Sequence, residues 1–470
     1  MSTEKTTEIF KNAPIPKAVL LNVIPSIISM IMVLVYNLAD TFFIGQTNNP
    51  YMVAAVSIAT PAFLIFMAIG MLFGIGGTSL ISRLLGEGNQ ERAKHVSAFC
   101  FWSGAAIGTM GMVAIWIFLD PICEMVGASA ETMKYTQQYL SIIAVGIPFV
   151  IVGNAFSNII RAEGKANIAM TGMIIGNLIN IILDPVMILG FGWDVAGAAI
   201  ATVLGNIVAA IFYMVYLASK KSMLSIRPGD YRIGQNIAKG VLAIGIPASL
   251  NSMLMSVSNI MVNNLMKPHG DMAVAGLGVA MKVNMIAVML LIGLGTGIQP
   301  VLGYCYGAGD KKRFTGVLKF SILLAVGMSA VMSVICYLGA GPMVKAFLED
   351  LDAFSYGMEF ARVLIISGPV LGVLFVLINT LQAMGRALPS LILSVSRQGL
   401  IYLPVLFLFN GIFHEARMLV AAQPVTDYGA TILAAVLYFA SVRKFFHRTE
   451  EEHLTAETDM PGEPAESAEG

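Results

Sequence analysis

The segment GIGGTSLISRLLGEGNQER (74–92) returns 221 residues later as GTGIQPVLGYCYGAGDKKR (295–313). The two copies share four glycines and a final arginine, and at the same offset Pro148 is matched by Pro369. Glycine and proline mark backbone positions that other residues fill poorly, so this shared spacing predicts a duplicated structure.

The composition of the chain is that of a membrane protein. Hydrophobic residues make up 57% of its 470 residues and charged residues 12%, whereas a soluble globular protein carries roughly 25% charged residues. The net charge is zero, which gives no reason to expect nucleic acid as a partner. The sequence shows no phosphate-binding loop in a strand–turn–helix context, no metal-ligand spacing and no nucleophile–base pairing. We therefore expect neither an enzyme nor a bound cofactor.

Apolar runs long enough to cross a bilayer as a helix, about 20 residues each, occur six times in each copy of the repeat. An even number of spans gives both copies the same orientation, as in transporters built from parallel repeats. We predict an all-α integral membrane protein whose twelve transmembrane helices form two pseudosymmetric six-helix bundles facing a central cleft. The predicted spans lie near 19–43, 53–81, 96–119, 136–160, 168–190, 195–217, 239–264, 274–302, 317–340, 359–383, 388–410 and 420–442.

The charged segments divide the chain into five parts. We expect an N-lobe at 19–217 and a C-lobe at 239–442, joined by a basic cytoplasmic linker at 218–238. Residues 1–18 form a cytoplasmic N-terminus. The acidic tail 443–470 contains proline and glycine and has no periodicity, so we expect it to be cytoplasmic and disordered.

The distribution of lysine and arginine sets the topology. With both termini in the cytoplasm, the inner segments hold 21 of these residues and the outer segments hold five. Because basic loops stay on the cytoplasmic side, we predict this orientation, in the cytoplasmic (inner) membrane of a bacterial cell. We expect a monomer in contact with membrane lipid and with a small-molecule substrate.

Two acidic residues in predicted spans have no acidic counterpart in the other half. Asp40 corresponds to Met261 and Asp184 to Val405. A charged side chain in the middle of a bilayer costs roughly 2.5–3.5 kcal/mol on insertion scales, so it usually faces a cavity and has a function. Two carboxylates in low dielectric can hold a proton near neutral pH, or bind Na⁺ with amide and hydroxyl oxygens. The alternative is that Asp40 is interfacial and Asp184 a polar group in helix packing.

In the fifth and sixth predicted spans, amide and hydroxyl side chains lie on one face of the helix. Asn177, Asn180 and Asp184 are spaced i, i+3, i+7 in the fifth span. Thr202 and Asn206 are spaced i, i+4 in the sixth span. These side chains can supply oxygen ligands beside the acids.

The first span carries a proline and two further polar residues. Tyr36 and Asn37 lie four and three residues before Asp40, on the same helical face. Pro25 should bend the span about four turns before Asp40, and it is the predicted hinge. A static kink is the alternative.

The second half offers two cations inside predicted spans. Lys282 and Arg397 could neutralise an acid, contact substrate, or extend to the nearest interface. Asp427, in AAQPVTDYG, lies near the outer end of the last span, where water could solvate it.

These features together resemble the multidrug and toxic compound extrusion (MATE) family. The resemblance implies two lobes of six helices that export organic cations or other amphiphiles in exchange for H⁺ or Na⁺. The acids Asp40 and Asp184 are similar to those of the DinF branch, whose ion-linked network lies in the N-lobe. The NorM branch would carry an acid after the proline of the tenth span, where Val370 stands here. The matching segments are YNLADTFFIGQ (36–46), RAEGKA (161–166), VAGAAIAT (195–202), QPVLGYCYGAGDKKR (299–313), QAMGRA (382–387), SRQGLIYLP (396–404) and AQPVTD (422–427).

The resemblance also implies residue roles. Those implied for ion coupling, by H⁺ or as Na⁺ ligands, are Asp40, Asn180, Asp184 and Thr202. The wider polar network around the cavity would comprise Tyr36, Asn37, Asn154, Asn177, Asn206, Lys282 and Arg397.

The sequence thus predicts a secondary active multidrug efflux transporter that works by alternating access. A flippase or exporter of a lipid-linked precursor would share the fold but needs a strongly cationic cavity, and only Lys282 and Arg397 lie in the spans. A membrane-embedded receptor or enzyme would need a catalytic cluster or an added domain, and the sequence indicates neither.

Overall fold

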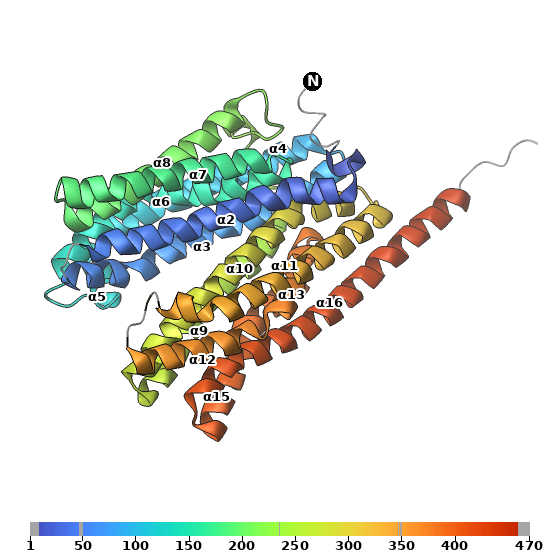
Figure 1. The fold of residues 1–470 in the computed structure, drawn as a ribbon. Coiled ribbons are helices and arrows are strands. Elements are labelled where there is room, and N and C mark those ends of the chain that lie inside the picture. Colours follow the sequence, from blue (N-terminus) through green and yellow to red (C-terminus); the bar gives the residue numbers. More distant parts are fainter. Residues whose placement is uncertain (1–8, 47–49, 235, 346, 348–349, 459–470) are drawn as a thin grey trace, which may run out of the picture.

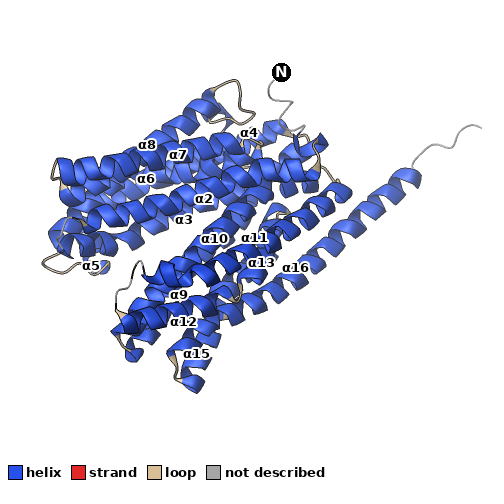
Figure 2. Cartoon of the chain, in the orientation of Figure 1, coloured by secondary structure: helices blue, strands red, loops and turns tan. Residues whose placement is uncertain are grey.

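The computed structural model describes residues 9–46, 50–234, 236–345, 347 and 350–458. In this part of the chain every regular element is a helix and no strand occurs, as Figure 2 shows. The prediction of an all-α protein is therefore confirmed.

The first half of the chain forms a bundle of long helices, the N-lobe. Local signals set the helix ends: Asn89 caps one helix by accepting a hydrogen bond from the backbone N–H of Arg92 at 3.1 Å, after Gly88 with φ +77°. The elements are α2 (Ile15–Gly45), α3 (Pro50–Gly86), α4 (Gln90–Ile117), α5 (Leu119–Met125), α6 (Met133–Ala162), α7 (Ala166–Pro185), the π-helix η1 (Val186–Gly190) and α8 (Asp194–Ala218).

The second half, the C-lobe, repeats this plan and also its capping chemistry. Asp310 accepts from the backbone N–H of Arg313 at 2.8 Å, following Gly309 with φ +70°. The elements are the 3₁₀ helix η2 (Pro228–Asp230) of the linker, then α9 (Ile237–Met266), the 3₁₀ helix η3 (Lys267–His269), α10 (Asp271–Gly307), α11 (Lys311–Lys345), α12 (Leu351–Ile365), α13 (Gly368–Ala383), α14 (Ala387–Val395), the π-helix η4 (Ser396–Leu400), α15 (Tyr402–Phe413) and α16 (Ala416–Thr458).

The number of membrane spans agrees with the prediction. Eleven spans in the described residues are long and apolar enough, and α12 with α13 makes a twelfth if this pair, bent by 50°, crosses once. The bend falls just before Pro369, whose ring has no N–H to continue the hydrogen-bond ladder of the preceding turn. Counted as one span, this pair begins at Leu351, whereas the predicted tenth span begins near 359.

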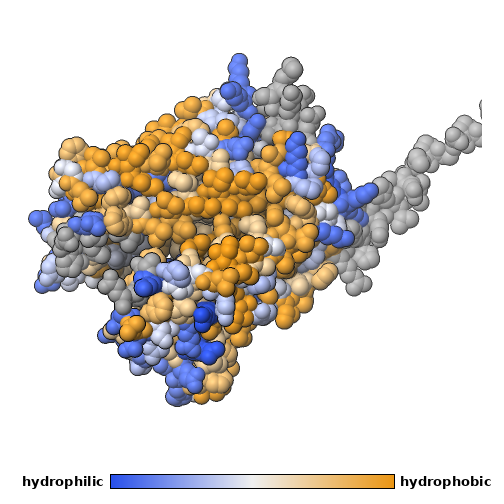
Figure 3. Space-filling model, in the orientation of Figure 1, coloured by the Kyte–Doolittle hydropathy of each residue, from blue (hydrophilic) through white to orange (hydrophobic). Residues whose placement is uncertain are grey.

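The two lobes lie together at one end of the molecule and diverge toward the other. In Figure 1 they separate toward the end that carries α5, α12 and α15. Apolar side chains cover the middle of the face shown in Figure 3, and hydrophilic side chains gather at both ends. Leu338 and Val215 are examples of exposed large apolar residues on the two lobes. This distribution is the one expected of helices in contact with lipid.

The closed end is built by the repeat itself, through a contact between α3 and α10. A Cβ on Gly86 would overlap the carbonyl oxygen of Tyr304, and a Cβ on Gly307 would overlap the carbonyl oxygen of Arg83. Gly86 and Gly307 are related by the 221-residue offset, and so are Arg83 and Tyr304. Each lobe thus supplies the same glycine and the same carbonyl, which is the form of an isologous contact about a two-fold axis.

The C-terminal tail departs from its prediction. Helix α16 continues to Thr458, past the expected end of the lobe at 442. The prediction of disorder for 443–470 is therefore wrong up to 458, because residues 443–458 contain no proline or glycine and are rich in Glu, Lys and Arg, which are good helix formers. Residues 459–470 lie outside the described part.

The linker between the lobes is fastened to the N-lobe by Glu163, at the end of α6. Its buried carboxylate accepts hydrogen bonds from the hydroxyl of Tyr216 at 2.7 Å, the hydroxyl of Ser222 at 3.1 Å and the backbone N–H of Met223 at 2.9 Å. Burial raises the pKa of Glu163, although these three donors favour the charged form.

Candidate functional site

The predicted polar cluster of the N-lobe is assembled mainly by α7 and α8. These helices pack closely because Gly176 faces Gly205 and Ala209, where a Cβ would already be within 2.8–2.9 Å of the neighbouring atoms. The contact brings the amide of Asn180 to 3.2 Å from the hydroxyl of Thr202, to which it donates. Both side chains are at most 5% exposed.

Asp184 lies one turn along α7 from Asn180 and is completely buried. Neither of its carboxylate oxygens has a hydrogen-bond partner among the described residues, and the same holds for Oδ1 of Asn180 and Nδ2 of Asn177. Buried polar atoms are normally paired, because an unpaired one costs about 1–3 kcal/mol. Three of these four atoms are oxygens, which have the chemistry to accept a proton or to coordinate a small cation.

Asp40 reaches this cluster from α2 and is partly exposed. It lies close enough to Asp184 for the two charges to interact. The hydroxyl of Tyr36 lies beside Thr202 and within electrostatic range of both acids. The structure therefore brings together the four predicted coupling residues and Tyr36.

Tyr139 is a member of the cluster that sequence reasoning missed. It lies on α6, within electrostatic range of Asp40, Tyr36 and Asp184. No acid or amide of the cluster lies at helical spacing from it, so only the packing of α6 against the other helices identifies it. Its position adds a second phenol to the site.

The other predicted companions bond locally. Asn206 donates to the carbonyl of Thr202 at 2.8 Å, one turn back on its own helix. Asn37 is exposed and donates to the carbonyl of Val33 at 2.9 Å. The Cβ of Asn154 packs against Gly70 of α3. Asn206 thus bonds within its own helix, and Asn154 lies at the contact of α6 with α3.

Pro25 and Lys282 lie away from the acids. Helix α2 runs unbroken through Pro25, and the hydroxyl of Ser29 donates to the Pro25 carbonyl at 2.9 Å, so the hinge remains a prediction. Lys282 is exposed, and its Nζ lies 5.2 Å from the centre of the Phe347 ring.

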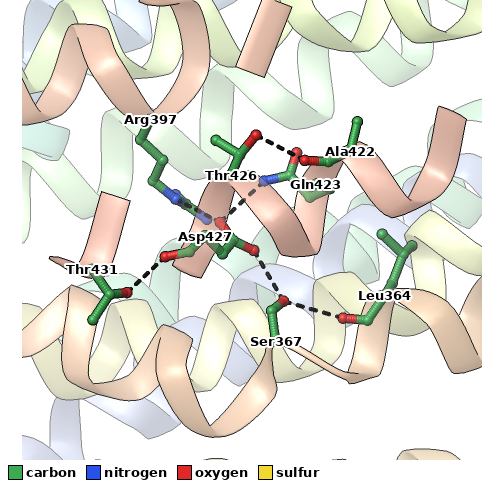
Figure 4. A network of polar contacts seen from close by, with 8 residues as sticks. All are labelled: Leu364, Ser367, Arg397, Ala422, Gln423, Thr426, Asp427 and Thr431. Atoms are coloured by element: carbon green, nitrogen blue, oxygen red, sulfur yellow. Dashed lines mark hydrogen bonds and ion pairs between the residues drawn. The ribbon is translucent and has the colours of Figure 1, made fainter. Parts of the chain in front are cut away.

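The C-lobe contains a second polar network, centred on Asp427 (Figure 4). Asp427 is 1% exposed, so the expectation that water solvates it is wrong. Arg397 donates from Nε to its carboxylate at 3.3 Å, Gln423 donates from Nε2 at 3.1 Å and Ser367 from Oγ at 3.0 Å. The Arg397 guanidinium also lies 5.1 Å from the centre of the Phe375 ring.

Arg397 therefore neutralises an acid and does not extend to the interface. It is 6% exposed and lies on the π-helical turn η4, while Ser367 lies at the break between α12 and α13. Asp427 thus binds side chains from η4 and from the break between α12 and α13. The partnership joins residues 30 positions apart, which helical spacing within one span cannot reveal.

The duplication is also detected by comparison with known families. One family model, MatE, matches the chain twice, over residues 25–186 and 247–408. The chain belongs to the MATE family. The family resemblance seen in the sequence is therefore confirmed, and its branch within the family is not decided by this match.

Relatives of this MATE protein cover most of its length. The multidrug export protein MepA of Staphylococcus aureus (strain MSSA476) is 32% identical over 405 residues, which are 86% of this chain and 89% of the relative. MepA of Staphylococcus haemolyticus (strain JCSC1435) is 32% identical over 404 residues, with the same coverage.

Solved MATE structures share the fold. A MATE protein crystallised in complex with MaL6 superimposes with a TM-score of 0.90 at 23% identity, covering 94% of this chain and 99% of the other. The outward-facing conformation of a multidrug resistance MATE family transporter gives a TM-score of 0.89 at 24% identity, with the same coverage. These likenesses support the two-lobed arrangement of twelve spans.

Proposed function

We propose that this MATE protein is a multidrug export transporter that exchanges H⁺ or Na⁺ for amphipathic or cationic organic molecules. Its family and its similarity to proteins named for multidrug export, over 86% of its length, support this function. No catalytic residue is assigned, and the substrate would bind between the two lobes.

One observation carries the coupling mechanism: the carboxylate of Asp184 is buried without a hydrogen-bond partner among the described residues, beside Asp40. A proton on either acid, or Na⁺ held by both with Asn180 and Thr202, would offset one of the two negative charges of the cluster. Release of that ion would leave both carboxylates charged, one of them fully buried, and the two would repel each other. Alternating access would use this difference to favour opposite openings of the lobes.

The N-lobe location of this cluster favours DinF-type coupling. In the C-lobe Val370, not an acid, follows Pro369 at the start of α13. Among the described residues no three His, Cys, Asp or Glu side chains come together as metal ligands, so Na⁺ would depend on amide and hydroxyl oxygens as well as the two acids.

We assign the closed end of the molecule to the cytoplasm. The loops at this end carry most of the basic residues, including Arg92 and Arg313. Both termini would then be cytoplasmic and the lobes would open outward, in a monomer in a bacterial cell membrane. The structural similarity to a MATE transporter solved in an outward-facing conformation supports this assignment.

A transport assay in vesicles tests the coupling residues. Efflux of ethidium or norfloxacin from the vesicles would be driven by an imposed ΔpH or an imposed ΔNa⁺, and the gradient that drives it identifies the ion. We expect Asp40→Asn and Asp184→Asn to lose most of the gradient-driven transport. Asp194→Asn is the matched control, since Asp194 is exposed and lies on the same lobe. Full gradient-driven transport by both cluster variants would refute the assignment.

The flippase alternative receives no support from the two cations in the spans. Arg397 is paired with Asp427, and Lys282 is exposed against Phe347. Neither forms part of a cationic cavity that would hold a pyrophosphate.

A further inference from the structure

The Asp427 network of the C-lobe shares two repeat-related positions with the polar residues of the N-lobe. The 221-residue offset relates Thr202 to Gln423 and Asn206 to Asp427. Both pairs lie on the last helix of their lobe, α8 and α16, and one member of each pair bonds the preceding span: Thr202 accepts from Asn180, and Asp427 accepts from Arg397. The same face of the duplicated structure therefore carries a polar site in each lobe.

The two sites differ in the residue that the preceding span contributes. The offset relates Arg397 to Gly176. At Gly176 the regular helix α7 touches α8, and a Cβ would lie 2.9 Å from the Gly205 carbonyl oxygen, so no long side chain fits. At Arg397 the chain forms the π-helical turn η4, which carries an extra residue per turn and changes the direction of its side chains.

The groups around Arg397 have the chemistry of a cation-binding site. A buried carboxylate, Asp427, lies beside the guanidinium, and an aromatic face, Phe375, lies 5.1 Å from it. Gln423 and Ser367 hold the carboxylate in place from two other directions (Figure 4). Aromatic faces with carboxylates bind ammonium and guanidinium ions in many proteins.

The bond between the cation and the carboxylate is a weak one for such a buried pair. The hydrogen bond from Arg397 to Asp427 is donated by Nε and is 3.3 Å long. Strong charge-assisted bonds of this type are about 2.7–2.9 Å long and often bidentate. The site therefore holds the guanidinium by its charge and ring rather than by a tight fork.

We propose that Arg397 is a tethered cation that fills a cation-binding site of the C-lobe built from Asp427, Gln423, Ser367 and Phe375. The site takes a guanidinium or a small alkylammonium ion, and in this protein the side chain of Arg397 is that ion. The C-lobe site is consequently closed to exchange, while its N-lobe copy stays open. The site itself depends only on the C-lobe geometry; the role of its copy rests on the proposed function.

Chemical rescue tests the proposal with purified protein in detergent. Arg397→Ala leaves Asp427 buried without its cation, and guanidinium chloride at low millimolar concentration should raise its melting temperature in a saturable way. Wild type and the double variant Arg397→Ala/Asp427→Asn should show no such rise. An absent rise in Arg397→Ala, or an equal rise in the double variant, would overturn the proposal.

A second comparison covers the case in which Arg397→Ala does not fold. The double variant Arg397→Gln/Asp427→Asn removes both charges, whereas Arg397→Gln leaves the Asp427 carboxylate buried without a cation. The double variant should therefore have the higher melting temperature. An Arg397→Gln protein as stable as wild type would also overturn the proposal. In an Asp184→Asn background the guanidinium effect on Arg397→Ala should persist even though coupled transport fails, which separates this site from the proposed coupling site.

Discussion

Each lobe buries a carboxylate where its last two spans meet, but the surroundings of the two carboxylates differ. In the C-lobe Asp427 has a cation and two neutral donors, whereas in the N-lobe Asp184 has no hydrogen-bond partner among the described residues and has Asp40 nearby. A paired buried charge stabilises one arrangement of its helices. An unpaired one changes its energy when a proton or ion arrives, so under the proposed coupling Asp427 has a structural role and Asp184 a switching role.

The largest expected effect is a difference in stability between the variants Asp427→Asn and Asp184→Asn. Asp427→Asn would leave Arg397 buried without its counter-charge, and breaking such a pair costs about 3–5 kcal/mol. Asp184→Asn would replace an unpaired buried carboxylate by a neutral isostere and should leave stability unchanged or higher. Thermal unfolding of both purified variants at pH 7 measures this. A stable Asp427→Asn beside a destabilised Asp184→Asn would reverse the comparison.

At the closed end, in contrast to the two acids, the lobes contribute equivalent residues, so matched substitutions should have equal effects. Gly86→Ala and Gly307→Ala each place a methyl group on a carbonyl of the other lobe, and overpacking of this kind costs about 1–3 kcal/mol. Both should open this end to a similar extent. Maleimide labelling of a cysteine introduced at Ser82, which is fully buried and touches Gly303, would report the opening.

Gly278→Ala is the control for that experiment. Gly278 lies on the exposed side of α10, and no atom is within 4 Å of the position of its Cβ. It should leave labelling at wild-type level. If only one of Gly86→Ala and Gly307→Ala increases the labelling strongly, the two halves of the contact are not equivalent in energy, although they are related by the pseudo-two-fold axis.

The sequence alone predicted the parts of this molecule that lipid and chain symmetry determine. A bilayer demands long apolar helices, so the spans and the repeat are readable from composition and spacing. The pair Arg397–Asp427 was not predicted, because it depends on how α16 packs against η4. One signal was present: the offset relates Asp427 to Asn206, a residue already singled out in the N-lobe. For Tyr139 no comparable signal exists.

Glu163 offers a further asymmetric position, since its counterpart in the C-lobe is Met384. Glu163→Ala would leave two donors of the linker and the Tyr216 hydroxyl of α8 without their acceptor and should destabilise the protein by about 1–3 kcal/mol. Thermal unfolding against Glu124→Ala, an exposed acid of α5, measures this. Equal melting temperatures for the two variants would contradict a fastening role for Glu163.

The pH dependence of the same site has a definite sign. Burial raises the pKa of Glu163 above its ordinary value of 4.5. The stability linked to its protonation is therefore fully present below pH 4.5 and is lost as the pH rises through the higher folded-state pKa. Glu163→Gln cannot ionise, so its melting temperature relative to wild type should increase over that interval. A relative decrease would mean that the hydrogen bonds outweigh burial.

The smallest effect is expected where one hydroxyl distinguishes the lobes. Tyr139 corresponds to Phe360, which is fully buried in the C-lobe. Tyr139→Phe gives the N-lobe the residue of its copy and removes a phenol that lies near both acids. If that hydroxyl bonds a carboxylate during the cycle, ion-driven efflux should fall roughly two- to tenfold, the effect of one hydrogen bond of about 0.5–1.5 kcal/mol. Tyr135→Phe, one turn earlier on α6, is the control. Slower efflux by Tyr139→Phe than by Tyr135→Phe would place the phenol in the ion pathway. Equal efflux rates for the two variants would confine switching to the two carboxylates and their amide and hydroxyl neighbours.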